Sequence, residues 1–269
     1  MRTKTLLLSA AALLAAGIVS SQAQAVYSQN VVGYASVVLQ SGVYEMIANP
    51  FTNGNNSASN VLTGLQGGEN VYIWNGHGYY QYNYLGAGNG TGFGGQSDWQ
   101  DISSPTNIPG DVYFSGYVFA PTPVLPPGQA FFVQNLGSSE TNTFTGVVAT
   151  TNSVTLQSGV YTMLASAIPV GGDISNGIIN LTQSLQGGEN VYVWNGHGYY
   201  QYNYLGAGNG TGFGGISDWQ DISSPTNIPG DVYFSGYVFA PDPAVTVGQG
   251  VFILNSGSSE QWTQSYTNH

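Results

Sequence analysis

The chain lacks cysteine and, beyond its first four residues, also lacks Lys and Arg. Its two basic residues are Arg2 and Lys4, whereas all 13 acidic residues follow them. Without ammonium or guanidinium groups the rest of the chain cannot neutralise phosphates, which argues against nucleic acid and anionic lipid surfaces as partners. The lack of cysteine excludes disulfides, thiolate metal sites and a cysteine nucleophile.

Long hydrophobic runs are also scarce, and the one present lies at the N-terminus. An apolar stretch from Leu6 to Val19 follows Arg2 and Lys4 and precedes Ala23-Gln24-Ala25. These are the three parts of a signal peptide, so we expect cleavage after Ala25 and export to the periplasm, the cell surface or the medium. The stretch is shorter than the ~20 residues that a spanning helix needs, so we predict no integral membrane segment.

The remainder is dominated by an internal repeat. Leu65 to Pro121 recurs as Leu185 to Pro241, and the only substitutions are at positions 73/193 and 96/216. Weaker similarity continues on both sides of this segment. We therefore predict a signal peptide over residues 1–25, a first β repeat over 26–150 and a second over 151–269.

Each repeat is rich in β-branched and aromatic runs that are separated by Gly, Asn, Pro and Ser. Val71 to Trp74 and His77 to Tyr84 flank Asn75-Gly76, which is typical of a two-residue type I′ hairpin. Further strand-like runs are Val43–Ala48, Val112–Ala120, Ala130–Asn135 and Thr141–Val148. Ser57–Leu65 and Ser175–Leu185 each indicate one short helix. We predict an all-β fold of two tandem antiparallel repeats, each a β-sandwich or a partly open barrel.

Three segments carry a resemblance to a known family. They are Asn30-Val31-Val32-Gly33-Tyr34, Val71-Tyr72-Ile73-Trp74-Asn75-Gly76 and Pro127-Gly128-Gln129-Ala130-Phe131-Phe132-Val133. The chain resembles exported, largely uncharacterised two-repeat proteins of verrucomicrobial bacteria, over most of its length after the leader. The resemblance implies secretion and a β-rich fold, and it carries over no activity and no catalytic residues. The Gly-rich loop Gly86–Gly95 and Val247, where the first copy has Pro127, depart from the family pattern.

One face of the predicted hairpin gathers aromatic, amide and imidazole groups. Pairing across Asn75-Gly76 sets Trp74 opposite His77 and Tyr72 opposite Tyr79. Such a face can stack on sugar rings and hydrogen-bond their hydroxyls, whereas a Trp in a sheet is more often part of a core. The residues that we expect to bind carbohydrate are Tyr72, Trp74, His77, Tyr79 and Gln81, with Tyr192, Trp194, His197, Tyr199 and Gln201 in the second repeat.

Acidic residues recur in loops that are rich in carbonyl, amide and hydroxyl oxygens. They are Asp98, Asp101 and Asp111, repeated as Asp218, Asp221 and Asp231. Oxygen-only surroundings suit calcium, although the spacing of known calcium loops is absent, and loop capping by Asp is the more common role. We expect no other cofactor. A carboxylate pair for glycoside hydrolysis stays open, because it needs a defined separation.

These observations favour a secreted or cell-surface, non-catalytic structural or adhesive protein. The alternative is a bivalent carbohydrate-binding module that uses the aromatic hairpin face of each repeat, and a secreted hydrolase is the less favoured third hypothesis. The exposure of Trp74 and Trp194 discriminates between them, since buried indoles favour a structural role and exposed coplanar indoles favour ligand binding.

Self-association through sheet edges is the other predicted interaction. Thr141 to Val148 is β-prone, uncharged and free of Pro. Natural sheets often protect such edges with Lys, which is missing from this part of the chain. We therefore predict that this run forms an exposed edge at which copies of the chain can pair.

Overall fold

The computed structural model describes residues 31–103, 108–177, 179–210, 217–223 and 228–266. The predicted signal peptide over residues 1–25 lies outside them. Residues from Val32 onward form one compact unit. Within the described ranges, no helix has the length and apolar character needed to cross a membrane.

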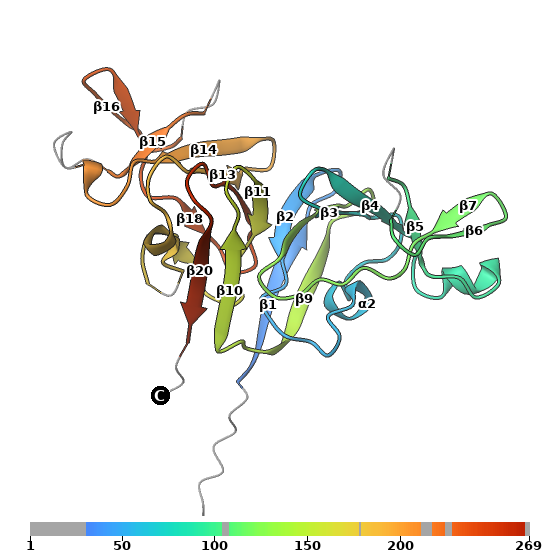
Figure 1. Ribbon diagram of the computed structural model, residues 1–269. Coiled ribbons are helices and arrows are strands. Elements are labelled where there is room, and N and C mark those ends of the chain that lie inside the picture. The colour runs from blue at the N-terminus through green and yellow to red at the C-terminus, as the bar shows by residue number, and fades with distance from the viewer. Residues whose placement is uncertain (1–30, 104–107, 178, 211–216, 224–227, 267–269) are drawn as a thin grey trace, which may run out of the picture. The chain divides into compact units, whose positions relative to one another are not determined.

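The first repeat pairs a large sheet with a small one. Its elements are β1 (Val32–Leu39), β2 (Tyr44–Ala48), α2 (Ala58–Val61), β3 (Asn70–Trp74), β4 (Tyr79–Tyr84), η1 (Asn89–Phe93), β5 (Trp99–Asp101), β6 (Val112–Phe114), β7 (Tyr117–Phe119), β8 (Ala130–Gln134) and β9 (Glu140–Val147). Seven strands form an antiparallel sheet in the order β2-β8-β3-β4-β5-β7-β6, and β1 pairs with β9 in a separate two-stranded sheet (Figure 1).

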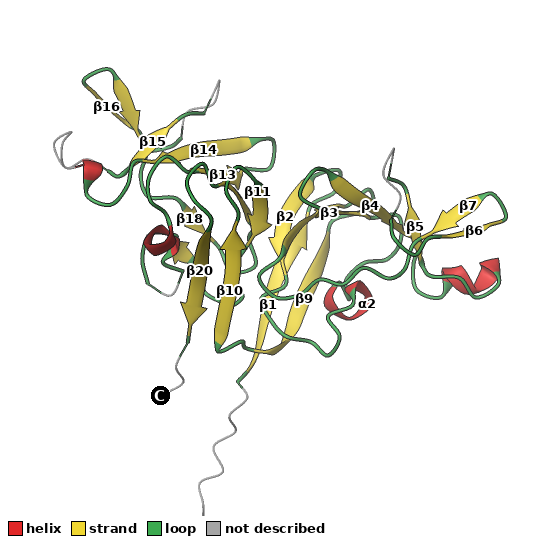
Figure 2. Ribbon diagram, viewed as in Figure 1, coloured by secondary structure: helices red, strands yellow, loops and turns green. Residues whose placement is uncertain are grey.

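The second repeat reproduces this arrangement. Its elements are β10 (Thr151–Leu156), β11 (Tyr161–Leu164), β12 (Gly172–Asp173), η2 (Leu181–Ser184), β13 (Asn190–Trp194), β14 (Tyr199–Tyr204), β15 (Trp219–Asp221), β16 (Val232–Phe234), β17 (Tyr237–Phe239), β18 (Ala244–Val245), β19 (Val251–Leu254) and β20 (Glu260–Ser265). The sheet order β11-β19-β13-β14-β15-β17-β16 matches the first repeat strand for strand, and β10 pairs with β20. The prediction of two tandem, nearly all-β repeats is confirmed, as the strand-dominated ribbon shows (Figure 2).

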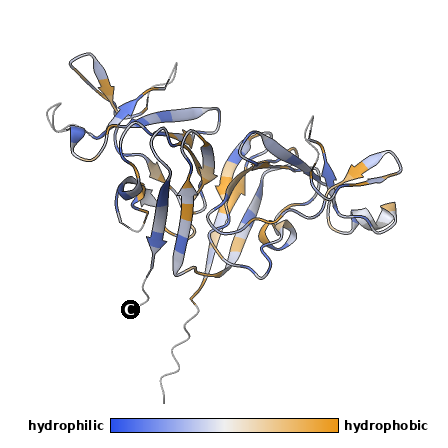
Figure 3. Ribbon diagram, in the orientation of Figure 1, coloured by the Kyte–Doolittle hydropathy of each residue, from blue (hydrophilic) through white to orange (hydrophobic). Residues whose placement is uncertain are grey.

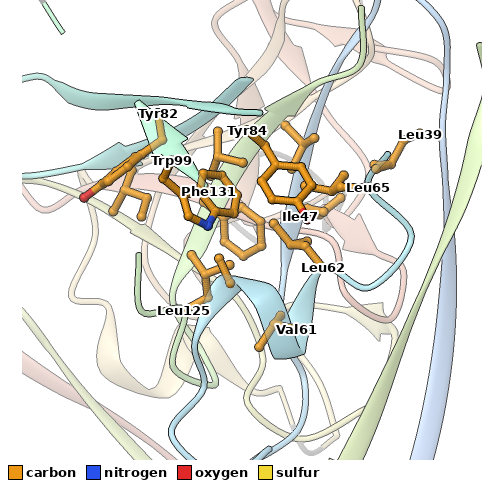
Figure 4. Packing of buried hydrophobic residues seen from close by; sticks show 14 of the residues in the cluster. Leu39, Ile47, Val61, Leu62, Leu65, Tyr82, Tyr84, Trp99, Leu125 and Phe131 are labelled. Atoms are coloured by element: carbon orange, nitrogen blue, oxygen red, sulfur yellow. The ribbon is translucent and has the colours of Figure 1, made fainter. Parts of the chain in front are cut away.

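Each repeat has its own hydrophobic core on the Val/Ile side of the β3–β4 hairpin. In the first repeat Val71 and Ile73 are buried with Trp99, whose side chain is 1% exposed. Leu39 of β1 and Phe144 of β9 belong to the same cluster, so the small sheet closes the core. Val61, the last residue of α2, and Leu62, which follows it, also pack into this core (Figure 4).

The predicted register of the hairpin is wrong by two residues. Trp74 pairs with Tyr79, not with His77, and Tyr72 pairs with Gln81. The connection is a four-residue loop because the Asn75 side-chain oxygen accepts hydrogen bonds from the backbone N–H groups of His77 and Gly78. A shift by two residues leaves the side chains of the paired strands on their predicted faces, since the strand period is two, whereas His77 moves into the loop.

Three other predicted elements also differ. The run Val112–Ala120 is not one strand but a tight hairpin, because Ser115 and Gly116 both adopt a positive φ. Ser57 is the N-cap of α2 without a side-chain hydrogen bond, and the helix ends at Val61. Of the second predicted helix, Ser175–Leu185, the residues Leu181–Ser184 form a 3₁₀ turn.

The two repeats are joined by paired backbone hydrogen bonds. Ala48 N–H donates to Gly248 O at 2.8 Å, and the matching bond runs from Ala165 N–H to Gly128 O at 2.9 Å. Because each bond has its counterpart with the repeats exchanged, the repeats meet through equivalent surfaces. The predicted boundary at residues 150/151 lies between β9 and β10.

Candidate functional site

The aromatic faces of the two hairpins meet where the repeats join. Trp74 Nε1 donates to the backbone oxygen of Tyr161 at 2.9 Å, and Trp194 Nε1 donates to that of Tyr44 at 2.7 Å. Each indole therefore crosses to the other repeat and satisfies its N–H there. A third cluster of buried side chains lies beneath these rings, formed by Met46, Ala48, Ala130, Phe132, Met163, Ala165 and Phe252.

The rings of this interface pack edge to face. The ring centroids of Trp74 and Phe252 lie 5.5 Å apart at 87°, and those of Phe132 and Trp194 lie 5.3 Å apart at 82°. Both geometries are in the favourable range for aromatic pairs. The two Trp side chains are half-buried, so they are neither enclosed core residues nor open coplanar surfaces. The aromatic face thus contributes to holding the repeats together.

The residues predicted to bind carbohydrate fall into two groups. Tyr72, Trp74, Tyr79 and Gln81 lie together on the half-buried face, and Tyr192, Trp194, Tyr199 and Gln201 do so in the second repeat. His77 and His197 are exposed in the connecting loops, away from the paired residues.

The phenol groups at the centre of the interface are neutral donors. Burial raises the pKa of Tyr79 to about 12, with an opposing effect from its hydrogen bond to Tyr199. Burial also raises the pKa of Tyr199. Both hydroxyls therefore keep their protons at ordinary pH, and because one donates to the other, the pair has one proton left to donate to an uncharged ligand.

A cleft of about 290 Å³ opens on one side of the interface. The first repeat contributes Trp74 and Tyr79, and the second contributes Tyr161, Tyr192, Tyr199, Gln201 and Phe252. The walls are aromatic, and the polar groups among them are phenol, indole and amide groups. We call this the inter-repeat cleft.

The aspartates predicted to bind calcium make hydrogen bonds within the loops around them. The Asp98 carboxylate accepts hydrogen bonds from the backbone N–H groups of Gly88 and Gly90, and it thereby fixes the Gly-rich loop. Asp218 makes the same contacts with Gly208 and Gly210. These carboxylates act as loop caps in the structure.

Asp101 and Asp111 are brought together, and both accept a hydrogen bond from the Ile108 N–H. Burial and the neighbouring Asp101 raise the pKa of Asp111 to about 6. Although burial opposes the shift, hydrogen bonds from Ser103 and Asp111 hold the pKa of Asp101 below its ordinary value. Asp221 and Asp231 repeat the pair. In the described parts of the chain, no three His, Asp or Glu side chains form a group that could hold a metal ion.

The structure adds a surface feature that the sequence interpretation missed. The β6–β7 hairpin exposes Tyr113, whose side chain is 70% accessible, together with Val112, Phe114 and Tyr117. Its copy, the β16–β17 hairpin, exposes Val232, Tyr233, Phe234 and Tyr237. Figure 3 colours part of the β6–β7 hairpin as hydrophobic. Together we call these segments the aromatic hairpins.

A sequence signal for the aromatic hairpins was present. Val112-Tyr113-Phe114 has no polar alternation, and Ser115-Gly116 is a turn dipeptide. In an edge strand of a sheet, three consecutive apolar residues cannot all face one core. Phe93 packs against the β7 strand of the hairpin, since its ring centroid lies 5.4 Å from that of Tyr117 and 5.3 Å from that of Phe119.

We compared the chain with known protein families, curated proteins and solved structures. No family model, no curated protein and no solved structure matches the chain.

Proposed function

We propose that the chain is a secreted or cell-surface, non-catalytic adhesive protein that contacts its target through the two aromatic hairpins. The observation that carries the proposal is the exposure of Tyr113 and Tyr233, at 70% and 67%, within identical hairpins of the two repeats. Contiguous exposed apolar side chains on a folded protein commonly mark an interaction surface. Tyr suits this role because one end of its ring system is apolar and the other is polar.

The two hairpins support a bivalent contact. The repeats are hydrogen-bonded to each other, so the second hairpin is held at a set position once the first has bound. Linked weak sites gain avidity over either site alone. The acidic chain without Lys or Arg after its leader repels anionic surfaces, so the target is an uncharged polymer surface that offers both apolar and hydroxyl groups.

Retention on microcrystalline cellulose tests this proposal. Tyr113→Ser with Tyr117→Ser removes one hairpin's rings, and Tyr233→Ser with Tyr237→Ser removes the other's. Either double variant should lose retention several-fold, and the combined variant should lose nearly all of it. Tyr34→Ser is the matched control, because Tyr34 is also highly exposed but lies on β1.

Two results contradict the proposal. The first is a wild-type protein that does not bind the cellulose. The second is a combined variant that binds as well as the wild type. Loss of binding by Tyr34→Ser to the same extent would show a general effect of surface tyrosines, and it would also contradict a role specific to the aromatic hairpins.

A further inference from the structure

The inter-repeat cleft lies on the side of the interface that includes Tyr192 of the second repeat. On the other side, Tyr72 Oη donates to Gln134 Oε1 at 3.0 Å, and Asn70 Nδ2 donates to the same oxygen at 3.3 Å. The position that corresponds to Gln134 on β19 is Leu254. One side of the interface therefore satisfies its tyrosine hydroxyl within the protein, whereas the other has lost that acceptor.

Polar groups in the cleft retain hydrogen-bonding capacity. The Tyr192 hydroxyl lies 3.4 Å from the Tyr161 hydroxyl, which is at the long limit of a hydrogen bond. The side-chain amide of Gln201 makes no hydrogen bond to any residue within the described ranges. A ligand that carries hydroxyl groups can use the phenol and the amide as donors or acceptors.

The chemistry of the walls selects an uncharged ligand. The lining contains no Asp, Glu, His, Lys or Arg, and burial raises the pKa of Tyr192 to about 12. The volume of about 290 Å³ is at the lower end for small-molecule sites and suits a single ring. Aromatic walls with a few convergent polar groups match a sugar ring, which has apolar C–H faces and polar edges.

We propose that the inter-repeat cleft binds one neutral pyranose ring per chain, in a composite site to which both repeats contribute. This site is separate from the aromatic hairpins and does not depend on their adhesive role. Trp74 comes from the first repeat and Gln201 from the second, so neither repeat forms the site alone.

The test is a titration of the full exported chain with glucose, N-acetylglucosamine and cellobiose, followed by tryptophan fluorescence and saturation-transfer NMR. Gln201→Ala should weaken binding about tenfold, because it removes hydrogen bonds worth about 1.4 kcal/mol. Gln81→Ala is the matched control, since Gln81 is the same residue in the other repeat and does not line the cleft. Leu254→Gln should also weaken binding, because the new amide can occupy the Tyr192 hydroxyl.

The outcomes separate this inference from the adhesive function. Tyr113→Ser and Tyr233→Ser should leave sugar affinity unchanged even where they abolish retention on cellulose. No binding of any of the three sugars overturns the composite site. It is also overturned if Gln201→Ala and Gln81→Ala have equal effects, or if indole binds more tightly than the sugars and displaces them.

Discussion

The two repeats are almost identical in the hairpins, but one position differs where they touch each other. Position 130 is Ala in the first repeat, and the corresponding position 250 is Gly in the second. A Cβ atom built on Gly250 would lie 2.3 Å from the Cβ of Ala130 and 3.1 Å from Cγ of Met46. Because equivalent surfaces meet at this point, position 130 faces position 250, and there is room for only one methyl group. The repeats could not have the same residue here unless both were Gly.

The comparison shows that similarity and divergence follow different physical constraints. The aromatic hairpins are exposed in both repeats, so the same sequence serves both. The interface imposes asymmetry at Ala130 against Gly250, because there is no space for a second methyl group. Gln134 against Leu254 is a second difference, and it decides whether the nearby Tyr hydroxyl has an amide acceptor within its own repeat.

Gly250→Ala should have the largest effect on stability. The added methyl overlaps Ala130, and overpacking of a filled core costs about 1–3 kcal/mol of unfolding free energy. Ala130→Gly in the same chain should restore most of the loss, because it exchanges the two residues between the repeats. Urea unfolding of the wild type, both single variants and the double variant measures the coupling.

The single variant Ala130→Gly serves as the control for this cycle. It should cost less than Gly250→Ala, since it removes a buried methyl without creating a clash. If the two single effects simply add in the double variant, the contact between positions 130 and 250 is not the reason for the asymmetry.

Gln134→Leu should have the next largest effect. It makes the first repeat resemble the second and removes the 3.0 Å acceptor of the half-buried Tyr72 hydroxyl, which keeps only its longer contact of 3.4 Å with the Tyr44 hydroxyl, at a cost of about 1 kcal/mol. Asn70 loses the same acceptor. Thermal unfolding should show a lower midpoint than the wild type, whereas Leu254→Gln should leave the midpoint unchanged or raise it. A Gln134→Leu variant as stable as the wild type would show that this hydrogen bond adds nothing to the interface.

Glu140 and Glu260 occupy corresponding positions and should differ in pH dependence. Burial, followed by the nearby Glu69 carboxylate, raises the pKa of Glu140 from an ordinary value of 4.5 to about 7. The folded state then binds more protons than the unfolded chain between these values, so the contribution of Glu140 to stability falls as pH rises through this window. Glu140→Gln should therefore stabilise the protein at pH 8 and have little effect near pH 4.

Glu260→Gln is the matched variant for this experiment. Burial and Glu189 raise the pKa of Glu260 as well, but by less than the shift at Glu140. The expected stabilisation at pH 8 is accordingly smaller. Urea midpoints measured from pH 4 to pH 8 compare the two, and equal curves for Glu140→Gln and the wild type would contradict the raised pKa of Glu140.

Local sequence patterns predicted the strands and their buried faces, because the period of two depends on neighbouring residues alone. They set Val71 and Trp74 on opposite faces of the hairpin, and in the structure Val71 is buried whereas Trp74 is half-buried. They could not predict what covers Trp74, because Tyr161 lies 87 residues further along the chain. The length of the hairpin loop was wrong because the Asn75 side chain stabilises a loop of four residues, whereas the Asn-Gly pair alone indicates a loop of two.

The smallest expected effect concerns the predicted edge at β9. The strand does lie at the edge of a two-stranded sheet, but the outer side is partly covered. Val147 exchanges two backbone hydrogen bonds with Thr52, each 2.9 Å long, and Asn142 binds Val61 O and Gly64 N–H through its side chain. Since the backbone groups of an antiparallel strand alternate in direction, those of Thr143 and Thr145 point the same way as those of Val147. No described residue pairs with the backbone of Thr143 or Thr145 on that side.

An unpaired edge that consists of Thr143 and Thr145 supports only weak self-association. Raising ionic strength should favour assembly of the wild type, because salt screens the repulsion between acidic chains. Thr145→Lys should oppose assembly, since an exposed Lys on an edge disfavours pairing. Thr143 is unsuitable for this change, because its hydroxyl lies 2.9 Å from that of Ser36. Sedimentation velocity at high concentration measures the effect. A wild type that stays monomeric at high salt would show that the cover supplied by Thr52 and Gly64 is already sufficient.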